Sequence, residues 1–325
     1  MSAKPALLEQ LLARRLLVLL GKGGVGKTVL GAALATVAAE RGLRTLVMET
    51  DSRAPLACMY GLAPDYRPRE IRANLAVMTL DGARALEEYL GMVVPGRAIL
   101  HAVTASPLYQ FFVQAAPGLR ELMMLGKVLF EIERKVNDPA YHDLVMLDAP
   151  ASGHALALLR MPAAARATFG DAVVGREARN IARLLHDRKR TALLEVTTSD
   201  PLAISETIEL LDSLRAMDLG PTAILFNRVP DLRFGEGDAK DFVFAATGVA
   251  PVAEIVQLAE VARRGIAARA RAKRAITLLR SRSKLELLEF GEHCGAASAQ
   301  LVERLVAGLR LTLNSAVKNR PAIDA

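Results

Sequence analysis

A glycine-rich run that ends in a lysine and a hydroxyl residue is the feature of this sequence best suited to chemistry. It reads Gly21-Lys22-Gly23-Gly24-Val25-Gly26-Lys27-Thr28 and fits the pattern GxxxxGK[ST] between a strand pattern and a helical pattern. Glycines let backbone N–H groups turn toward phosphate oxygens, and the following helix adds its positive end. We expect Lys27 to reach the β and γ phosphates and the Thr28 hydroxyl to complete a Mg²⁺ shell.

Three further charged residues are candidates for the same site. Lys22 lies at the tip of the loop and points away from its own helix, so we expect it to reach a nucleotide bound by another subunit, as an arginine finger does. Asp51 and Asp148 each follow an apolar run, and open α/β sheets bind ligands at the carboxyl ends of their strands. A carboxylate there orients the attacking water or holds Mg²⁺. The alternatives are a surface lysine and two helix caps.

Uninterrupted apolar runs predict the strands that would position these residues, because strands buried on both faces of a parallel sheet have this pattern. The runs are Leu16–Leu20, Thr45–Met48, Leu75–Leu80, Leu144–Leu147, Ala192–Val196 and Ala223–Phe226. Helical patterns alternate with them, notably Thr28–Glu40, which closes at Arg41 and Gly42. We predict an α/β fold: a doubly wound, mostly parallel sheet flanked by helices.

The rhythm of strand and helix divides the chain into parts. Residues 14–230 are predicted to form a P-loop core, and residues 82–138 within it a helical insert that includes Pro117–Lys135. The strand signal fades past Val229, so residues 231–325 are predicted to be a mainly helical part of the same domain. Its helical patterns are Phe242–Lys284 and Ala296–Leu311.

The composition narrows the class of protein. The chain has 325 residues, 52% of them hydrophobic, which is enough for one large domain with an insert. No apolar run approaches the roughly 20 residues that cross a bilayer, so we expect no membrane-spanning helix. The two cysteines, Cys58 and Cys294, form no CxxC pair, as is typical of a reducing compartment. We predict a cytoplasmic protein, with peripheral attachment to a membrane as an alternative.

Positive charge is concentrated late in the chain. Nine basic residues follow one another without an acidic residue between them: Arg263, Arg264, Arg269, Arg271, Lys273, Arg274, Arg280, Arg282 and Lys284. The formal charge of the whole chain is +7, so the remainder sums to 7 − 9 = −2. The stretch could face an acidic partner, an anionic lipid surface or nucleic acid, or be a solvated helix face. No aromatic residue is interleaved to stack on bases, which makes nucleic acid a minor option.

Two motifs together resemble the family of the arsenite-pump ATPase and the tail-anchored-protein targeting ATPase, within the MinD and ParA-like group. One is the glycine-rich run with Lys22 at its second position. The other is Asp148-Ala149-Pro150-Ala151-Ser152-Gly153-His154, followed by Leu156, Leu158, Leu159 and Pro162. The second motif is the more specific, and the similarity spans roughly residues 14 to 230.

The resemblance implies ATP as the nucleotide, Mg²⁺ as the metal and the role of each matching residue. By position, Lys27 and Lys22 would contact phosphates in cis and in trans, and Asp51 would polarise the attacking water. Thr28 and Asp148 would belong to the Mg²⁺ shell.

The family also implies two further contacts to the nucleotide. Gly153 would flex beside the γ phosphate. Asn227, which follows a late strand pattern, would read the adenine.

The sequence departs from the family in two places. After Asp51 the family usually has Pro-Ala-His, whereas this chain has Ser52-Arg53-Ala54, so the first switch is expected to signal differently or to turn over slowly. The paired cysteines that bind zinc at the targeting factor's dimer interface are absent, so we expect no zinc or arsenite site. His154 is predicted to be a switch residue and not a metal ligand.

These observations favour an ATP-driven dimeric switch, homodimeric or paired with a paralogous ATPase, that couples hydrolysis to a client or membrane protein. Met92, Met123 and Met124 are candidates to line an apolar client groove in the insert, with core packing as the alternative. A second hypothesis is a positioning ATPase that contacts a membrane or nucleoid through the basic stretch and the Leu301–Leu313 pattern. A third is a slow regulatory subunit paired with a paralogue.

Overall fold

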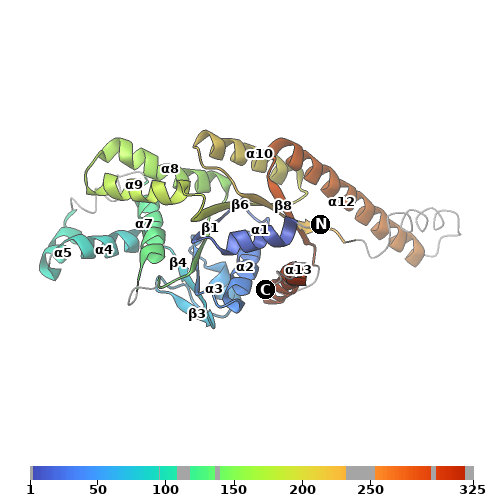
Figure 1. Cartoon of the computed structure of the whole chain (residues 1–325), viewed down its shortest axis with the longest axis horizontal. Coiled ribbons are helices and arrows are strands. Elements are labelled where there is room, and N and C mark those ends of the chain that lie inside the picture. The colour runs from blue at the N-terminus through green and yellow to red at the C-terminus, as the bar shows by residue number, and fades with distance from the viewer. Residues whose placement is uncertain are drawn as a thin grey trace, which may run out of the picture.

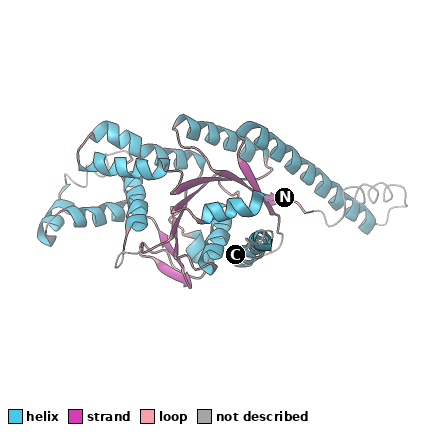
Figure 2. Cartoon of the chain, viewed as in Figure 1, coloured by secondary structure: helices cyan, strands magenta, loops and turns pink. Residues whose placement is uncertain are grey.

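The computed structural model describes residues 3–94, 96–107, 118–135, 140–231, 253–293 and 298–318. An eight-stranded sheet with the order β3-β4-β2-β5-β1-β6-β7-β8 forms its centre, and helices cover both faces (Figures 1 and 2). Neighbouring strands are parallel except for the edge pair β3 and β4. The predicted doubly wound, mostly parallel α/β fold is confirmed.

The apolar runs become strands because both faces of the sheet are buried. The strands are β1 (Leu16–Leu20), β2 (Thr45–Glu49), β3 (Arg69–Arg72), β4 (Leu75–Thr79), β5 (Leu144–Asp148), β6 (Thr191–Thr197), β7 (Ala223–Val229) and β8 (Glu286–Gly291). In β1 the side chains of Leu17 and Leu19 belong to one core cluster, whereas Leu16, Val18 and Leu20 belong to the other. Both sets are buried, so the run shows no polar alternation.

Two strands were missed by the sequence analysis. β8 joins β7 at one edge of the sheet and lies between α12 and α13 in the part of the chain for which mainly helical structure was predicted. β3 pairs antiparallel with β4 at the other edge. Edge strands have solvent on one side, and both of these carry exposed or half-buried charged residues, which hid them from a search for continuous apolar runs.

One face of the sheet is covered by helices from the two ends of the described chain. These helices are α1 (Ala3–Leu12), α2 (Lys27–Glu40), α3 (Pro55–Met59) and α13 (Ser298–Lys318). The predicted helix that follows the glycine-rich run is confirmed as α2. In α13, Val302, Leu305, Val306 and Leu309 are buried in the same core as α2, so the proposed use of the Leu301–Leu313 pattern as a membrane contact was wrong: its apolar side packs on the protein.

The other face carries the remaining helices. They are α4 (Gly82–Val93), α5 (Arg97–Thr104), α7 (Leu119–Glu133), α8 (Ser152–Phe169), α9 (Val173–His186), α10 (Pro201–Ala216) and α12 (Ala253–Ser283). Helices α4, α5 and α7 come from the predicted insert. Figure 1 shows α4 and α7 beside α8 and α9, which follow β5, so two chain segments build one helical lobe at this end of the molecule, with α5 next to α4. Cys294 and residues 242–252 lie outside the described residues.

Candidate functional site

The glycine-rich run follows β1, which lies between β5 and β6 in the sheet. Gly24 and Gly26 adopt the left-handed backbone region, with φ of +82° and +98°, which L side chains rarely adopt. A Cβ on Gly26 would lie 2.4 Å from Nδ2 of Asn227, and one on Gly21 would lie 2.2 Å from the carbonyl oxygen of Val196. The loop therefore packs tightly on β6 and β7 before α2 begins at Lys27.

Lys27 spans the loop from the first turn of α2. Its Nζ donates to the carbonyl oxygens of Gly21 at 2.8 Å and Lys22 at 3.1 Å. Burial lowers the pKa of this amine, while the nearby carboxylates of Asp148 and Glu195 oppose that shift. An ammonium held over the loop by two carbonyls is poised to receive phosphate oxygens.

Thr28 and Asp148, the two residues predicted to hold Mg²⁺, contact each other directly. The Thr28 hydroxyl donates to Oδ2 of Asp148 at 2.5 Å, and Asp148 lies at the end of β5, in register with Leu19 of β1 and Glu49 of β2. Burial raises the pKa of Asp148, and its Oδ1 is buried without a hydrogen-bond partner among the described residues. A buried carboxylate oxygen with a spare coordination position beside a hydroxyl fits a hard cation such as Mg²⁺.

Asp51 lies two residues beyond β2, at the same edge of the sheet. Its neighbour Thr50 donates from both its backbone N and its hydroxyl to the carbonyl oxygen of Asp148. The Asp51 carboxylate is occupied by Arg53, whose Nη2 donates to Oδ2 at 2.6 Å. This hydrogen bond lowers the pKa of Asp51. The structure thus brings Asp51 to the edge that holds Thr28 and Asp148, with its carboxylate already paired.

Lys22 is engaged within its own chain. Its Nζ lies 3.6 Å from Oε1 of Glu206 and 3.9 Å from Oδ1 of Asp200. Both acids lie on or just before α10, and Oε2 of Glu206 accepts a hydrogen bond from the Ser152 hydroxyl at 3.3 Å. Glu206 therefore links the tip of the loop to the start of α8.

Gly153 lies in the first turn of α8, beside Ser152. A Cβ added to Gly153 would meet no atom within 4 Å, so packing in this conformation does not require a glycine there. Its predicted role beside the γ phosphate stays a prediction.

Asn227 and Arg228, near the end of β7, hold the glycine-rich run from the side. Nδ2 of Asn227 donates to the carbonyl oxygen of Val25 at 2.8 Å, and Nη2 of Arg228 donates to that of Gly24 at 3.0 Å. Asn227 is buried and lies directly against the loop. Its reading of adenine stays a prediction, and the contact of Arg228 was not foreseen.

Glu195 is a buried acidic residue of the site that the sequence analysis overlooked. It lies within β6 and is almost fully buried. Burial raises its pKa to about 8, opposed by a hydrogen bond from Thr207 and by Lys27. The signal was available as a glutamate inside the apolar run Ala192–Val196, because an acid at such a position is rare unless it is paired.

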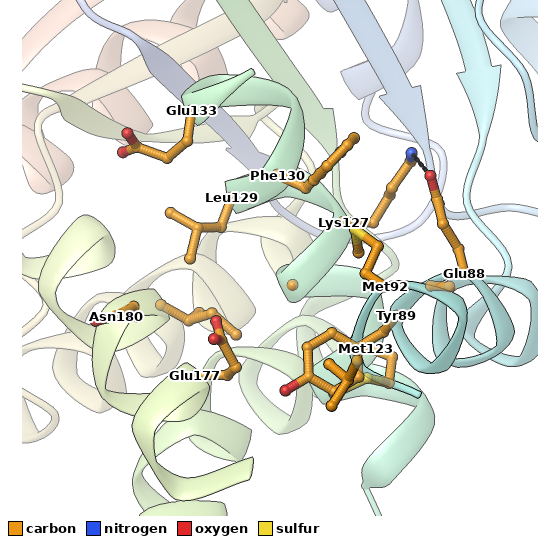
Figure 3. A pocket seen from close by; sticks show the side chains of 14 residues that line it. Glu88, Tyr89, Met92, Met123, Lys127, Leu129, Phe130, Glu133, Glu177 and Asn180 are labelled. Atoms are coloured by element: carbon orange, nitrogen blue, oxygen red, sulfur yellow. Dashed lines mark hydrogen bonds and ion pairs between the residues drawn. The ribbon is translucent and has the colours of Figure 1, made fainter. Parts of the chain in front are cut away.

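The helical lobe holds a groove of about 420 Å³ between α4, α7 and α9. Figure 3 shows Met92, Tyr89, Met123 and Leu129 around it, with Glu133, Glu177 and Asn180 toward one side. Met92 is 56% exposed and Met123 only 4%. Met124 packs against the core and does not line the groove, so the methionines divide between groove and core.

Within the described part of the chain, no group of three or more His, Cys, Asp or Glu residues could hold a metal ion. Cys58 is exposed and unpaired. No helix among the described residues is long and apolar enough to cross a bilayer. A nucleotide-bound Mg²⁺ ion needs no cluster of such side chains, because water and phosphate oxygens would complete the shell of Thr28 and Asp148.

Comparison with known proteins identifies relatives of this chain. ATPase BagA of Mycobacterium tuberculosis is 29% identical over 226 residues, which cover 66% of this chain and 65% of that protein. A protein named putative arsenical pump-driving ATPase from Halobacterium salinarum is 32% identical over 159 residues, 46% of this chain and 24% of its own length. ATPase ASNA1 homolog 1 of Paramecium tetraurelia is 28% identical over 144 residues, 44% of this chain and 42% of that protein.

The chain spans 65% of the length of its mycobacterial relative. A model of the anion-transporting ATPase family matches residues 14–177, which is half of the chain. The resemblance inferred from the two motifs is confirmed, and the chain belongs to the anion-transporting ATPase family.

Proposed function

We propose that this protein is a Mg²⁺-dependent ATPase that works as a dimeric switch and couples hydrolysis to a client or partner protein. The observation that carries the proposal is the meeting of Lys27, the Thr28–Asp148 pair and Asp51 at the carboxyl ends of three adjacent strands. Phosphoryl transfer needs positioning and charge stabilisation more than covalent chemistry. These four residues supply both.

Each residue has a distinct task. Backbone N–H groups of the glycine-rich run and Lys27 bind the phosphates, and Asp51 accepts a proton or hydrogen bond from the attacking water. Thr28 and Asp148 would hold Mg²⁺, whose positive charge would neutralise negative charge on the phosphate oxygens. Asn227, which donates a hydrogen bond to the Val25 carbonyl oxygen of the glycine-rich run, would contact the base.

Lys22 is proposed to act on the nucleotide of the partner subunit. In the single chain its amine is held by Glu206 and Asp200, in ion pairs that are partly exposed and therefore cheap to break. Dimer formation would exchange these carboxylates for phosphate oxygens. We propose a homodimer, or a heterodimer with a paralogous ATPase.

A mixing experiment tests both hydrolysis and the trans contact. A Lys22→Ala subunit has an intact site of its own but cannot supply Lys22 to the site of its partner. An Asp51→Asn subunit supplies Lys22 to its partner but lacks the carboxylate of its own site. In a homodimer each variant alone is inactive, whereas a mixture restores one site in each mixed dimer, giving about a quarter of the wild-type rate. A mixture as inactive as its components would remove the trans role of Lys22. A wild-type rate that stays near zero at all concentrations would contradict the homodimeric switch.

The groove of the helical lobe is the proposed client surface. Its lining combines exposed Met92 with Tyr89, Leu129 and Phe130, and methionine adapts to varied apolar partners. An apolar helical peptide that carries a photoreactive group should crosslink to the wild-type protein. Met92→Glu should abolish this crosslinking and leave the rate of ATP hydrolysis unchanged. Val173→Glu, at an exposed apolar residue outside the groove lining, is the matched control and should leave crosslinking intact.

Arg53 favours a second candidate function, a subunit that binds ATP but hydrolyses it slowly beside a faster paralogue. Its guanidinium occupies the carboxylate that would orient the water. A single-turnover assay distinguishes the two functions. A slow regulatory subunit would bind ATP tightly but release phosphate only very slowly unless its paralogue is present.

A further inference from the structure

Four arginines of the basic stretch share one side of α12. We define the arginine face as the side of α12 that carries Arg263, Arg271, Arg274 and Arg282, with Leu278 among them. At about 100° per residue these five positions lie within an arc of about 100°. From the first to the last they span roughly 28 Å, at about 1.5 Å per residue.

The opposite side of α12 is committed to the protein. Ala272, Ile276, Leu279 and Ser283 are buried, and the first three pack with Phe226 of β7 in one core cluster. The apolar side of α12 is therefore buried in the protein core and is not available for insertion into a bilayer. Figure 1 shows α12 running along the outside of the molecule and beyond the sheet, with the other end of the molecule holding the helical lobe.

The four arginines of this face form no ion pair with a described acidic residue, although Glu260 lies on the same side of the helix one turn before Arg263. All four arginines are exposed. Glu260 is engaged by Arg264, which lies at the edge of the same side, and on another side of the helix Arg280 pairs with Glu289. Four arginines without an ion pair to a described residue, along one side of a helix, mark a surface for an anionic partner.

The composition of the face favours phospholipid headgroups over a nucleic acid. Leu278 is 43% exposed in the middle of the face, where a lipid interface accepts a leucine and a phosphate backbone gains nothing from one. Arginine outnumbers lysine in the basic stretch, which suits the phosphate groups of either partner because a guanidinium binds them in a bidentate manner. No aromatic residue is present for base stacking.

We propose that the arginine face of α12 binds the surface of membranes that contain anionic phospholipids. The arginines contact headgroup phosphates and Leu278 enters the interface, so the attachment is peripheral and weakens with salt. This inference goes beyond the proposed ATPase and does not depend on it.

Vesicle flotation of the full-length protein tests the proposal. The chain should float with phosphatidylcholine vesicles that contain about 30% phosphatidylglycerol and not with pure phosphatidylcholine. Arg271→Gln/Arg274→Gln should lower the partition coefficient on the order of 30-fold, since each arginine near the surface contributes about a factor of 5. Arg263→Gln/Arg282→Gln should lower the partition coefficient by a similar factor. This second double variant keeps the proposal testable if the first one folds poorly.

The matched control is Arg160→Gln/Arg166→Gln, which removes two exposed arginines of α8 and should leave flotation unchanged. Leu278→Ala should weaken binding a few-fold without changing its salt dependence. Equal flotation with neutral vesicles, no flotation, or an equal loss in the control pair would overturn the proposal. Tighter binding to a short DNA duplex than to the vesicles, lost in the same arginine variants, would assign the face to nucleic acid instead.

Discussion

Arg53 lies across both carboxylate oxygens of Asp51. Its Nε and backbone N each donate to Oδ1 at 3.0 Å, and its Nη2 donates to Oδ2 at 2.6 Å. The Arg53 side chain is 87% exposed, so the pair adds little to stability and opens easily. Because Asp51 is the proposed partner of the attacking water, Arg53 competes with that water for the same oxygens.

The first prediction follows from this competition. Arg53→Ala should raise kcat for ATP hydrolysis about threefold to tenfold and leave KM nearly unchanged, because the variant frees Asp51 without touching the phosphate loop. The kcat of Arg53→Lys should lie between those of the wild-type protein and Arg53→Ala, since an ammonium cannot bind both carboxylate oxygens of Asp51 as a guanidinium does. Arg69→Ala, which removes an exposed pair with Asp65, is the control. A lower kcat in Arg53→Ala would mean that Arg53 stabilises the transferring phosphate instead.

The second prediction concerns Mg²⁺. Asp148→Asn should raise the Mg²⁺ concentration for half-maximal hydrolysis by about 10- to 100-fold, because it removes the negative charge beside Thr28. Removing Mg²⁺ with EDTA should abolish hydrolysis by the unaltered protein. Asp51→Asn is the comparison: it should lower kcat while the Mg²⁺ dependence stays the same. If Asp148→Asn leaves the Mg²⁺ titration unmoved, this residue does not belong to the metal site.

The third prediction concerns pH and Glu195. Burial raises the pKa of Glu195 to about 8 from a usual 4.5, so the folded state keeps a proton that the unfolded chain releases. The resulting stability is fully present below about pH 4.5 and is lost as the pH rises toward 8. Glu195→Gln keeps the bond to Thr207 and needs no proton. It should raise the free energy of unfolding by about 1–2 kcal/mol at pH 9 and change it little at pH 4.5.

Urea denaturation at the two pH values measures this effect. Glu209→Gln, at an exposed position of α10, is the control and should show no difference between them. A Glu195→Gln variant that is less stable at pH 9 would mean that the carboxylate is charged in the folded state and paired with Lys27.

The fourth prediction concerns a buried ion-pair cluster at the base of the helical lobe. Nζ of Lys127 lies 2.9 Å from Oε1 of Glu131 and 2.8 Å from Oε1 of Glu88, and Nε2 of His142 lies 3.4 Å from Oε2 of Glu131. Burial works to raise the pKa of Glu131, but His142 and Lys127 outweigh it and lower the pKa to about 2. The carboxylate is therefore charged and depends on its partners.

Lys127→Met should lower the free energy of unfolding by about 3–5 kcal/mol, because it leaves a buried charge without its main partner. Lys127→Met/Glu131→Leu should recover part of that loss, since both charges are then gone. Thermal or urea denaturation of the two variants is the measurement. A double variant less stable than the single one would show that Glu131 contributes through His142 and Arg134 as much as through Lys127.

The sequence alone determined the local parts of the site. The spacing of Gly21–Thr28 specifies its own backbone, since glycine permits the left-handed region and a helix must follow. Uninterrupted apolar runs specified six of the strands, because burial on both faces leaves no other pattern. The edge strands β3 and β8 escaped because a half-exposed strand keeps its charges and its apolar run is short.

The partners of each charged residue were decided only by the tertiary structure. The sequence placed Asp148 after a strand, but the position of β5 between β1 and β2 is what sets its carboxylate against Thr28. Likewise, the pairing of Lys22 with Glu206 joins residues far apart in the chain, and the neutral form favoured for Glu195 depends on complete burial. Such contacts depend on strand order and desolvation, which arise from the whole fold and not from any local spacing.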